Sequence, residues 1–458
     1  MGIFAALVSE SILELPAVEQ ARRIRQGRLR SESLVELYLD RIERLDGEYA
    51  AFVAINREKS LQEARRIDRL RCKESPFLGV PTGIKDLYYA KGFETRYGSD
   101  ANPWFPAPFD GPHARTLKKA GFIIVGKTST SELSLLPVVD PQIHPPTRNP
   151  WDASRYAGGS SGGAGAAVSA RMLPIAPGSD GAGSIRIPAA CCGLFGHKPS
   201  PWRIPHLGAH WLDPMGLIAL GPIARNVEDG ATLFDVLMER DPEEPDSMRS
   251  MSRSKGPRMK IGLLCESPLG RTSPAHAQAA SEAARALARA GHQLVDIPPI
   301  RASVDEFLPV YTRFIARIPV LFEKRLEALT RWFRAEGRRY TKAEEHQARN
   351  ELVRRLLGAF GDCDIILSPT IPIPPPKVGA HHGMEPASAF RELAHLGAFT
   401  AMANLLRAPA STLPWSICDG LPVGLQLLGR SGEDARVIAL AGELEALRGG
   451  PFPPPPLP

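Results

Sequence analysis

The chain has 458 residues, of which 43% are hydrophobic and 23% are charged, with a formal net charge of +6. This composition is typical of a folded globular protein and excludes a disordered chain. Its six cysteines are too sparse for a disulfide scaffold, and no apolar run reaches the roughly 20 residues that a membrane helix needs.

The ends of the chain and its charge bear on location and partners. The apolar stretch 3–8 lacks the basic leader and the small-residue cleavage site of a signal peptide, so we expect a cytoplasmic protein. The positive net charge and an arginine cluster at residues 22–30 would fit nucleic-acid binding. However, glutamates flank the cluster, and no aromatic residues interleave with it to stack on bases. We therefore interpret it as a solvated helix face and expect no nucleic-acid partner and no membrane contact.

The first third of the chain reads as alternating helices and strands. Apolar residues recur at three-and-four spacing up to Ile42, which predicts two helices, with Ser31 as the cap of the second. A strand at 50–55 and a helix at 61–70 follow. The Pro- and Gly-punctuated segment 78–86 predicts a strand and a loop, which places Lys85 at a strand end. A helix at 114–120 and a buried strand at 122–125 continue the alternation, which is typical of layered α/β folds.

The remainder begins with an unusual segment. Glycines crowd residues 158–196, which indicates backbone in unusual conformations rather than regular structure. Residues 240–258 are polar and predict an exposed, linker-like excursion. The tail 451–458 holds six prolines and is expected to be extended, either disordered or packed along the surface. Between these segments we predict strands at 259–264, 293–297, 364–368, 410–415 and 423–428, and helices at 275–290, 303–358 and 432–447.

Three segments carry the residues from which an active site can be built: Ile84-Lys85-Asp86, Ala157-Gly-Gly-Ser160-Ser161-Gly-Gly, and residues 178–188. The third is a loop of small residues that ends at Ser184. The backbone N–H groups of Gly181, Ala182, Gly183 and Ser184 can converge there on a developing oxyanion. A serine hydroxyl needs an adjacent base. No histidine is near Ser160 or Ser184 in sequence, so a lysine whose pKa is lowered by burial is the natural candidate.

These segments resemble the amidase signature family of serine hydrolases, most specifically over residues 158–199. The resemblance implies that Lys85 is the base, that Ser160 is a bridging serine preceded by a cis peptide, and that Ser184 is the nucleophile. It also implies an α/β fold in which a central mixed, twisted β-sheet is covered by helices on both faces. We expect one such domain over residues 1–458.

The surroundings of the serine loop include supporting residues and departures from the family pattern. Asp180 and Arg186 bracket the loop with opposite charges, so we expect them to form a buried ion pair that shapes it, and we expect Ser161 to be structural. The family usually has Asp-Thr-Gly-Gly-Ser, whereas this chain has Asp180-Gly-Ala-Gly-Ser184; alanine keeps the N–H group. Departures at 198–203 and 404–409 are expected to affect the substrate channel and not the triad.

Other short motifs invite different interpretations. Residues 121–128 have P-loop spacing, but their apolar, strand-like positions would commit the N–H groups to a sheet instead of to phosphates. Residues 159–163 fit a nucleophile elbow but lack the hydrophobic strand that precedes one. The pair His381 and His382 has no acidic or cysteine partner at ligand spacing, so we expect no metal site.

The expected function is hydrolysis of an amide bond through an acyl-enzyme on Ser184, which releases a carboxylic acid and ammonia or an amine. No cofactor is required, and cleavage of esters as a side activity is left open. The expected partner is a small-molecule amide, and a homodimer is one assembly left open. The alternative is a non-hydrolytic or assembly role, such as a glutaminase-type amidotransferase subunit that feeds ammonia to a partner enzyme.

Overall fold

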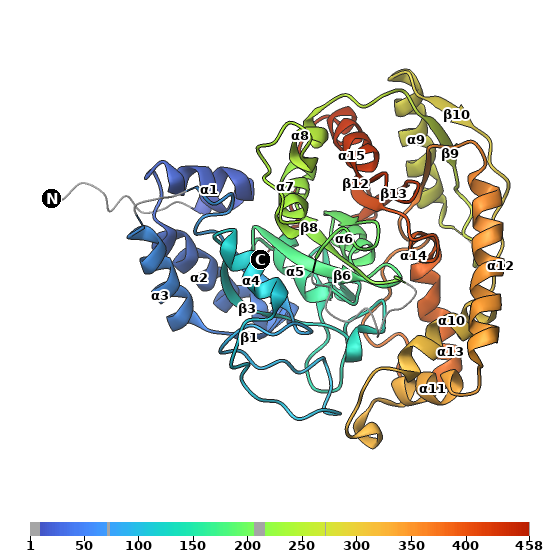
Figure 1. The fold of residues 1–458 in the computed structure, drawn as a ribbon, viewed down its shortest axis with the longest axis horizontal. Coiled ribbons are helices and arrows are strands. Elements are labelled where there is room, and N and C mark those ends of the chain that lie inside the picture. Colours follow the sequence, from blue (N-terminus) through green and yellow to red (C-terminus); the bar gives the residue numbers. More distant parts are fainter. Residues whose placement is uncertain (1–9, 71–73, 206–215, 271, 458) are drawn as a thin grey trace.

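The fold is described from a computed structural model, in which residues 10–70, 74–205, 216–270 and 272–457 are placed. It is an α/β fold with strands at the centre and helices around them (Figure 1). The apolar stretch 3–8, on which the expectation of a cytoplasmic location rested, lies outside the described residues. No helix among the described residues is both long enough and apolar enough to cross a membrane.

A mixed sheet forms the centre of the molecule. Within the described residues its eight strands are β6 (Ile175–Asp180), β7 (Phe195–Lys198), β8 (Ala219–Ala224), β9 (Lys260–Leu263), β10 (Gln293–Val295), β11 (Ile365–Pro369), β12 (Ala410–Cys418) and β13 (Leu421–Leu428). Their order is β10-β9-β11-β13-β12-β7-β8-β6. β9 pairs in parallel with β10 and β11, and the other neighbours are antiparallel. The predicted mixed sheet is confirmed.

A smaller sheet carries Lys85. It contains β1 (Phe52–Ile55), β2 (Pro81–Lys85) and β3 (Ile123–Thr128), in the order β1-β3-β2. β2 runs parallel to β3, and Lys85 is its last residue, opposite Thr128. A separate hairpin of β4 (Arg148–Asn149) and β5 (Asp152–Tyr156) leads into the segment that contains Ser160. Lys85 therefore ends a strand, as predicted.

Helices cover both faces of the central sheet. The longer ones are α1 (Ala17–Arg25), α2 (Ser31–Tyr49), α3 (Arg57–Asp68), α4 (Pro112–Lys119), α5 (Gly162–Ser169), α7 (Val227–Leu237), α9 (Pro274–Arg289), α10 (Val304–Ala316), α11 (Ala328–Gly337), α12 (Lys342–Phe360), α13 (Pro386–Ala394) and α15 (Asp434–Arg448). The shorter ones are α6 (Arg186–Cys191), α8 (Met248–Arg253) and α14 (Ala401–Leu405), with single turns η1 (Glu10–Glu14), η2 (Glu132–Ser134), η3 (Glu323–Arg325) and η4 (His395–Gly397). α1–α3 lie at one end of the molecule and α10–α13 at the other (Figure 1).

Two neighbouring residues of β7 show that the sheet is covered on both sides. The ring of Phe195 packs directly on Gly230 of α7. At Gly196, a Cβ atom would meet Ala189 of α6. Because successive side chains of a strand point to opposite faces, α6 and α7 cover opposite faces of the sheet. The expected covering by helices is confirmed.

The glycine-rich segment 158–196 is more regular than predicted. It contains α5, β6, α6 and the start of β7, and every residue of α5 is buried. Its glycines allow close approach within this regular structure. At Gly163, for example, a Cβ atom would lie 2.4 Å from the Ala51 oxygen and from the Ser129 nitrogen. The high glycine content therefore reflects tight packing, which a reading of local conformation could not reveal.

Residues 240–258, expected to form an exposed excursion, are exposed at 241 and 243–246 and also include a short helix. They contain α8, in which Met248 is buried, and this helix packs against α7 and α15. The carboxylate of Asp235 accepts hydrogen bonds from the N–H groups of Met248 and Arg249 at 2.8 and 2.9 Å. Asp235 therefore caps the start of α8 from outside this segment. The polar composition of residues 240–258 does not indicate such a contact.

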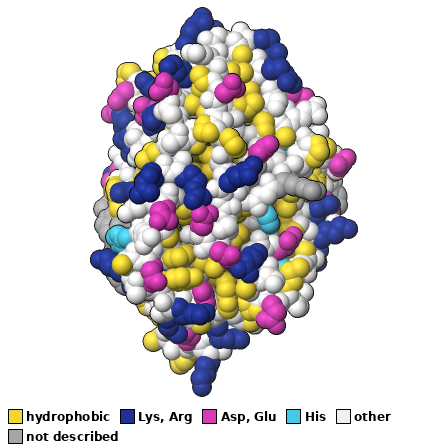
Figure 2. Space-filling model, turned by 90° about the vertical axis from the view of Figure 1, so that its right-hand side faces the viewer, with side chains coloured by type: hydrophobic (Ala, Val, Ile, Leu, Met, Phe, Trp, Pro, Cys, Tyr) yellow, Lys and Arg dark blue, Asp and Glu magenta, His cyan; other side chains and the backbone are white. Residues whose placement is uncertain are grey.

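Near the two ends of the described chain, Ser31, the proline-rich tail and the arginine cluster each make defined contacts. Ser31 is the first residue of α2 rather than its cap, and its hydroxyl donates to the Gly79 oxygen. The tail 451–457 has no regular structure, but Phe452 packs on Trp151 with ring centroids 5.8 Å apart. In the arginine cluster at 22–30, Arg22 and Arg23 both pair with Glu19. On another face, over α12, acidic and basic side chains are interspersed (Figure 2).

Candidate active site

Lys85 lies at the centre of a buried cluster of hydroxyl groups. Its side chain is only 1% exposed, and its Nζ donates to Ser160 Oγ at 2.8 Å, Ser161 Oγ at 3.0 Å and Ser179 Oγ at 3.0 Å. Burial lowers the pKa of Lys85 from 10.5 to about 7, against a smaller opposite effect of the Asp180 charge. The lysine can therefore be neutral near pH 7 and accept a proton from a hydroxyl group.

Ser160 and Ser161 are held between β5 and α5. The peptide bond between Gly159 and Ser160 is cis, as the family resemblance implied. Ser161 Oγ donates to the backbone oxygen of Ser179 at 3.2 Å and accepts from its N–H at 3.3 Å. These bonds tie the segment of Ser160 to strand β6, whose end leads directly to Ser184.

Ser184 lies in the turn between β6 and α6. Its backbone oxygen accepts a hydrogen bond from the N–H of Ser161 at 3.1 Å, so the two serine segments are in direct contact. Its side chain is half-buried and lines the same cavity as Ser160 and Ser179. The structure thus brings Lys85, Ser160 and Ser184 to one place, although they are far apart in sequence.

Asp180 and Arg186 form a bidentate ion pair beneath the serine loop. Arg186 Nε and Nη2 donate to the two carboxylate oxygens of Asp180 at 2.9 and 2.8 Å, and both side chains are fully buried. Burial alone would raise the pKa of Asp180, but the charge and hydrogen bonds of Arg186 outweigh it and lower the pKa to about 2. Arg186 also donates to Gln426 Oε1 at 2.7 Å. The serine loop is therefore supported by a buried ion pair whose charged groups are hydrogen-bonded.

One of the predicted oxyanion donors is engaged elsewhere. The N–H of Gly183 donates to Asp180 Oδ1 at 2.8 Å, which differs from its predicted role. Gly183 has φ +133°, and a Cβ atom there would lie 2.2 Å from Thr400 Oγ1, so only glycine fits. By contrast, Gly181 and Ala182 line the cavity together with Ser184. Gly183 therefore shapes the turn that presents these neighbours.

Sequence reasoning missed three residues of this network: Ser179, Tyr88 and Asn404. Ser179 is the third hydroxyl partner of Lys85, and Tyr88 in turn hydrogen-bonds to Ser179. Asn404 Nδ2 donates to the backbone oxygen of Asp180 at 3.1 Å, and Asn404 Oδ1 accepts from Arg186 at 2.7 Å. The departure at 404–409 therefore reaches the support of the serine loop and not only the channel. The departure at 198–203 does reach the channel, because Trp202 lines the cavity.

The serine cluster opens on a cavity of about 460 Å³. This volume lies within the usual range for small-molecule sites, about 300–1,000 Å³. Helices α10, α12, α13 and α14 contribute a large part of the cavity lining, mostly with apolar side chains. A substrate in this cavity would be in contact with Ser160, Ser184 and the small residues between β6 and α6.

Lys127, the lysine of the P-loop-like motif, has a structural role. It lies on β3, which is paired on both sides, as expected of a strand. Its Nζ lies 3.2 Å from Asp86 Oδ1, and both side chains are buried. Lys127 is thus bound within the protein, and residues 123–128 form a paired strand, so the interpretation of this motif as a strand is confirmed.

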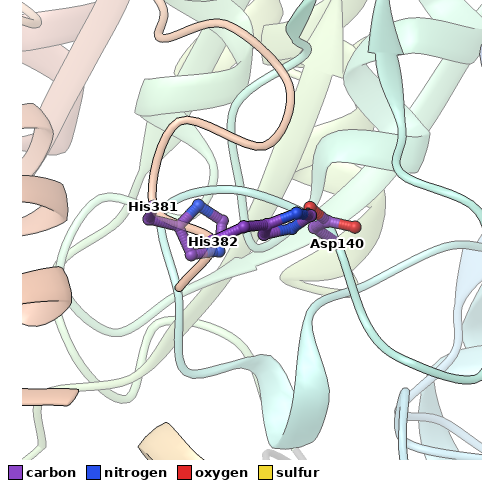
Figure 3. A group of neighbouring side chains, drawn as sticks. All are labelled: Asp140, His381 and His382. Carbon is purple, nitrogen blue, oxygen red and sulfur yellow. The ribbon is translucent and has the colours of Figure 1, made fainter. Parts of the chain in front are cut away.

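The pair His381 and His382 has the acidic partner that sequence spacing did not reveal. His382 Nε2 lies 2.8 Å from Asp140 Oδ2, which also accepts a hydrogen bond from the Tyr156 hydroxyl. Nitrogen and oxygen atoms of the three side chains lie within 4.8 Å of one another (Figure 3). They are the described residues that could hold a metal ion, but none of them lines the cavity. Through Asp140, the segment after β11 that holds His381 and His382 is linked to Tyr156 of β5.

Replacing Arg186 by alanine is expected to destabilise the protein by about 3–5 kcal/mol, because it leaves the buried Asp180 carboxylate without its partner. The measurement is the free energy of unfolding in urea. Arg57→Ala is the matched control, because Arg57 pairs with Asp40 at an exposed site and should cost less than about 1 kcal/mol. Equal losses in the two variants would contradict a supporting role for the buried pair.

The fold and the site together define a class of protein. An α/β fold that buries a lysine against serine hydroxyls, at the wall of a cavity with room for a small molecule, is the arrangement expected of an enzyme. The sequence model of the Amidase family matches residues 33–438. The chain therefore belongs to the amidase family, and it is a hydrolase of amide bonds.

Individual relatives agree with this assignment. The chain is 36% identical over 450 residues to AmiB2, a Mycobacterium tuberculosis protein named as an amidase, with 94% of this chain and 96% of the relative covered. It is 30% identical to the A subunit of the glutamyl-tRNA(Gln) amidotransferase from Marinobacter nauticus, with 93% and 96% covered. Among solved structures, 6-aminohexanoate cyclic dimer hydrolase superposes with a TM-score of 0.87 at 28% identity, over 97% of this chain and 99% of that one.

Proposed function

We propose that the protein hydrolyses amides through an acyl-enzyme on Ser184, with Lys85 as the base and Ser160 as the bridge between them. One observation carries the proposal: the fully buried Lys85, whose pKa is about 7, is hydrogen-bonded to Ser160 at 2.8 Å beside the cavity that Ser184 lines. A neutral amine in this position can accept the proton that makes a serine nucleophilic.

In the acylation step a bond forms between Ser184 Oγ and the amide carbon, the C–N bond breaks, and protons are relayed through Ser160 to and from Lys85. Ser184 Oγ attacks the amide carbon while its proton passes to Ser160, and the proton of Ser160 passes to Lys85. The negative charge develops on the carbonyl oxygen, where the N–H groups of Gly181, Ala182 and Ser184 can stabilise it. The C–N bond then breaks, Ser160 protonates the leaving nitrogen, and Lys85 returns a proton to Ser160.

Deacylation uses the same groups in reverse. Water attacks the ester carbon of the acyl-enzyme and loses a proton through Ser160 to Lys85. When the tetrahedral intermediate collapses, Ser184 recovers its proton and the carboxylic acid leaves. The mechanism needs no cofactor. Esters would enter the same route because their carbonyl carbon is attacked in the same way.

Covalent labelling tests the proposal. A fluorophosphonate should attach to Ser184, as located by mass spectrometry of the digested protein, and the isolated chain should turn over simple amides. Ser160→Ala should slow labelling by about 10²–10⁴-fold, because the proton of Ser184 passes through Ser160. Ser134→Ala is the control, since Ser134 lines the cavity but bonds to Thr130 instead of Lys85. An adduct on another serine, or unchanged labelling of Ser160→Ala, would refute the mechanism.

A further inference from the structure

The cavity beside Ser184 has two chemically different sides. The serine side contributes hydroxyl and backbone groups. Another part of the lining comes from the helices α10, α12, α13 and α14, and its side chains include Phe307, Tyr311, Phe314, Leu356, Phe390 and Met402. Aromatic rings contact one another across these helices, since the rings of Tyr311 and Phe390 are stacked with centroids 5.6 Å apart. This side therefore offers a packed apolar surface.

No charged group faces a ligand from the described residues that line this cavity. They include no aspartate, glutamate, lysine, arginine or histidine. Two of the tyrosine hydroxyls in the lining are already bound within the protein: Tyr311 donates to the Leu135 backbone oxygen, and Tyr97 donates to the Tyr89 hydroxyl. The described lining thus presents a neutral, mostly apolar wall to the part of a substrate that extends beyond the scissile bond.

This wall has a direct consequence for selectivity. Against the described lining, an ionised ammonium or carboxylate group would lose its hydration without gaining a partner of opposite charge, which is strongly unfavourable. An alkyl or aryl group instead leaves water for an apolar surface, and each buried methylene strengthens binding about fourfold. Free glutamine carries both an α-ammonium and an α-carboxylate, so the cavity does not suit a glutaminase-type role.

We propose that this enzyme acts on neutral amides that bear a bulky apolar substituent, an aryl group or a medium-length alkyl chain, and that this substituent occupies the helical side of the cavity. The proposal rests on the proposed function of Ser184, because it assigns the substrate class of that site. The apolar group can belong to the acyl part or to the amine part of the amide. The experiments below distinguish the two.

Kinetics with two substrate series provide the first test. In one series p-nitroanilides carry acyl chains from acetyl to decanoyl; in the other, acetamides carry N-alkyl chains of the same lengths. In one of the series, kcat/KM should rise about fourfold per methylene until the cavity is filled. A chain that ends in an ammonium group, as in 6-aminohexanoyl, should be at least tenfold poorer than hexanoyl. A flat dependence in both series, or a preference for the charged chain, would overturn the proposal.

A cavity-filling variant provides the second test. Ala394 lines the cavity from α13, whereas Glu392 lies on the exposed face of the same helix. Ala394→Phe should lower the ratio of kcat/KM for octanoyl to that for acetyl substrate at least tenfold, because the added ring takes the space of the longer chain. Glu392→Phe, the matched control, should leave this ratio unchanged. If both variants change the ratio equally, the alkyl chain does not lie beside α13.

Binding measured without turnover separates this proposal from the mechanism. Octanamide should bind the Ser184→Ala protein in calorimetry, whereas glutamine at the same concentration should not. If fluorophosphonate labels Ser184 but glutamine binds as well as octanamide, the substrate class is wrong and the mechanism stands. If octanamide binds but no fluorophosphonate adduct forms on Ser184, the mechanism fails and the assignment of the cavity is retained.

Discussion

The Ser184→Ala protein is expected to lose turnover of amides by a factor of about 10⁴ or more, and to lose covalent labelling by a fluorophosphonate completely. The change removes one oxygen atom from a half-buried position and leaves the Asp180–Arg186 pair intact, so the fold should be retained. Initial rates on a p-nitroanilide, mass spectrometry of the labelled protein and the free energy of unfolding together check this result.

The comparison with Arg186→Ala sharpens this prediction. Arg186→Ala should lose stability, whereas Ser184→Ala should lose activity at unchanged stability. If the serine variant also unfolds at much lower urea concentration, its inactivity would be a consequence of misfolding. If it is stable and still labelled, the nucleophile is a different residue.

Replacement of Lys85 by arginine is expected to be as damaging as replacement by alanine, with a loss of several orders of magnitude in kcat/KM. The base must be neutral to accept a proton, and a guanidinium group stays protonated throughout the accessible pH range. Lys85→Met is the matched neutral variant, because it keeps a long side chain without a basic nitrogen. If the arginine variant were active, the enzyme would require only a positive charge at position 85, and Lys85 would not be the base.

The pH dependence of the wild-type enzyme reports the same group. Burial lowers the pKa of Lys85 to about 7, so the neutral, active form dominates above that pH. kcat/KM should therefore rise about tenfold per pH unit below pH 7 and become constant above it. A profile that falls as the pH rises through 7 would require a protonated group as the essential species and would contradict the role of Lys85 as the base.

The parts of the fold that were predicted correctly have strong local patterns. The strand at 259–264 and the helix at 275–290 have clear apolar periodicity, and both are present as β9 and α9. The strands β6 and β8 were missed because glycine and proline interrupt them. In the sheet, Pro177 pairs with Pro222 and Gly178 with Gly221, and β6 is an edge strand, where proline is tolerated because no second neighbour needs its missing N–H group. Antiparallel pairing of β6 with β8 in the tertiary fold, rather than local propensity, defines these strands.

The site was predicted to a similar extent. Glycine-rich spacing and family resemblance indicated Lys85, Ser160 and Ser184, which the fold brings together. The contribution of Asn404 could not be inferred, because its partners Asp180 and Arg186 are more than 200 residues away along the chain. The same applies to the Asp140 partner of His382. Contacts of this kind depend on tertiary structure and have no local signature.

The burial of Lys85 also has a consequence for folding. In the unfolded chain this lysine titrates near 10.5, whereas in the folded protein its pKa is about 7. Between these two pH values the unfolded state binds more protons, so the free energy of unfolding rises with pH, by up to roughly 1.36 kcal/mol per unit from this group. That contribution is complete only above pH 10.5 and is lost as the pH falls through 7. Near neutral pH the enzyme therefore folds less stably than it would with an apolar side chain at position 85, and the same burial that makes the lysine a base limits the thermodynamic stability of the fold.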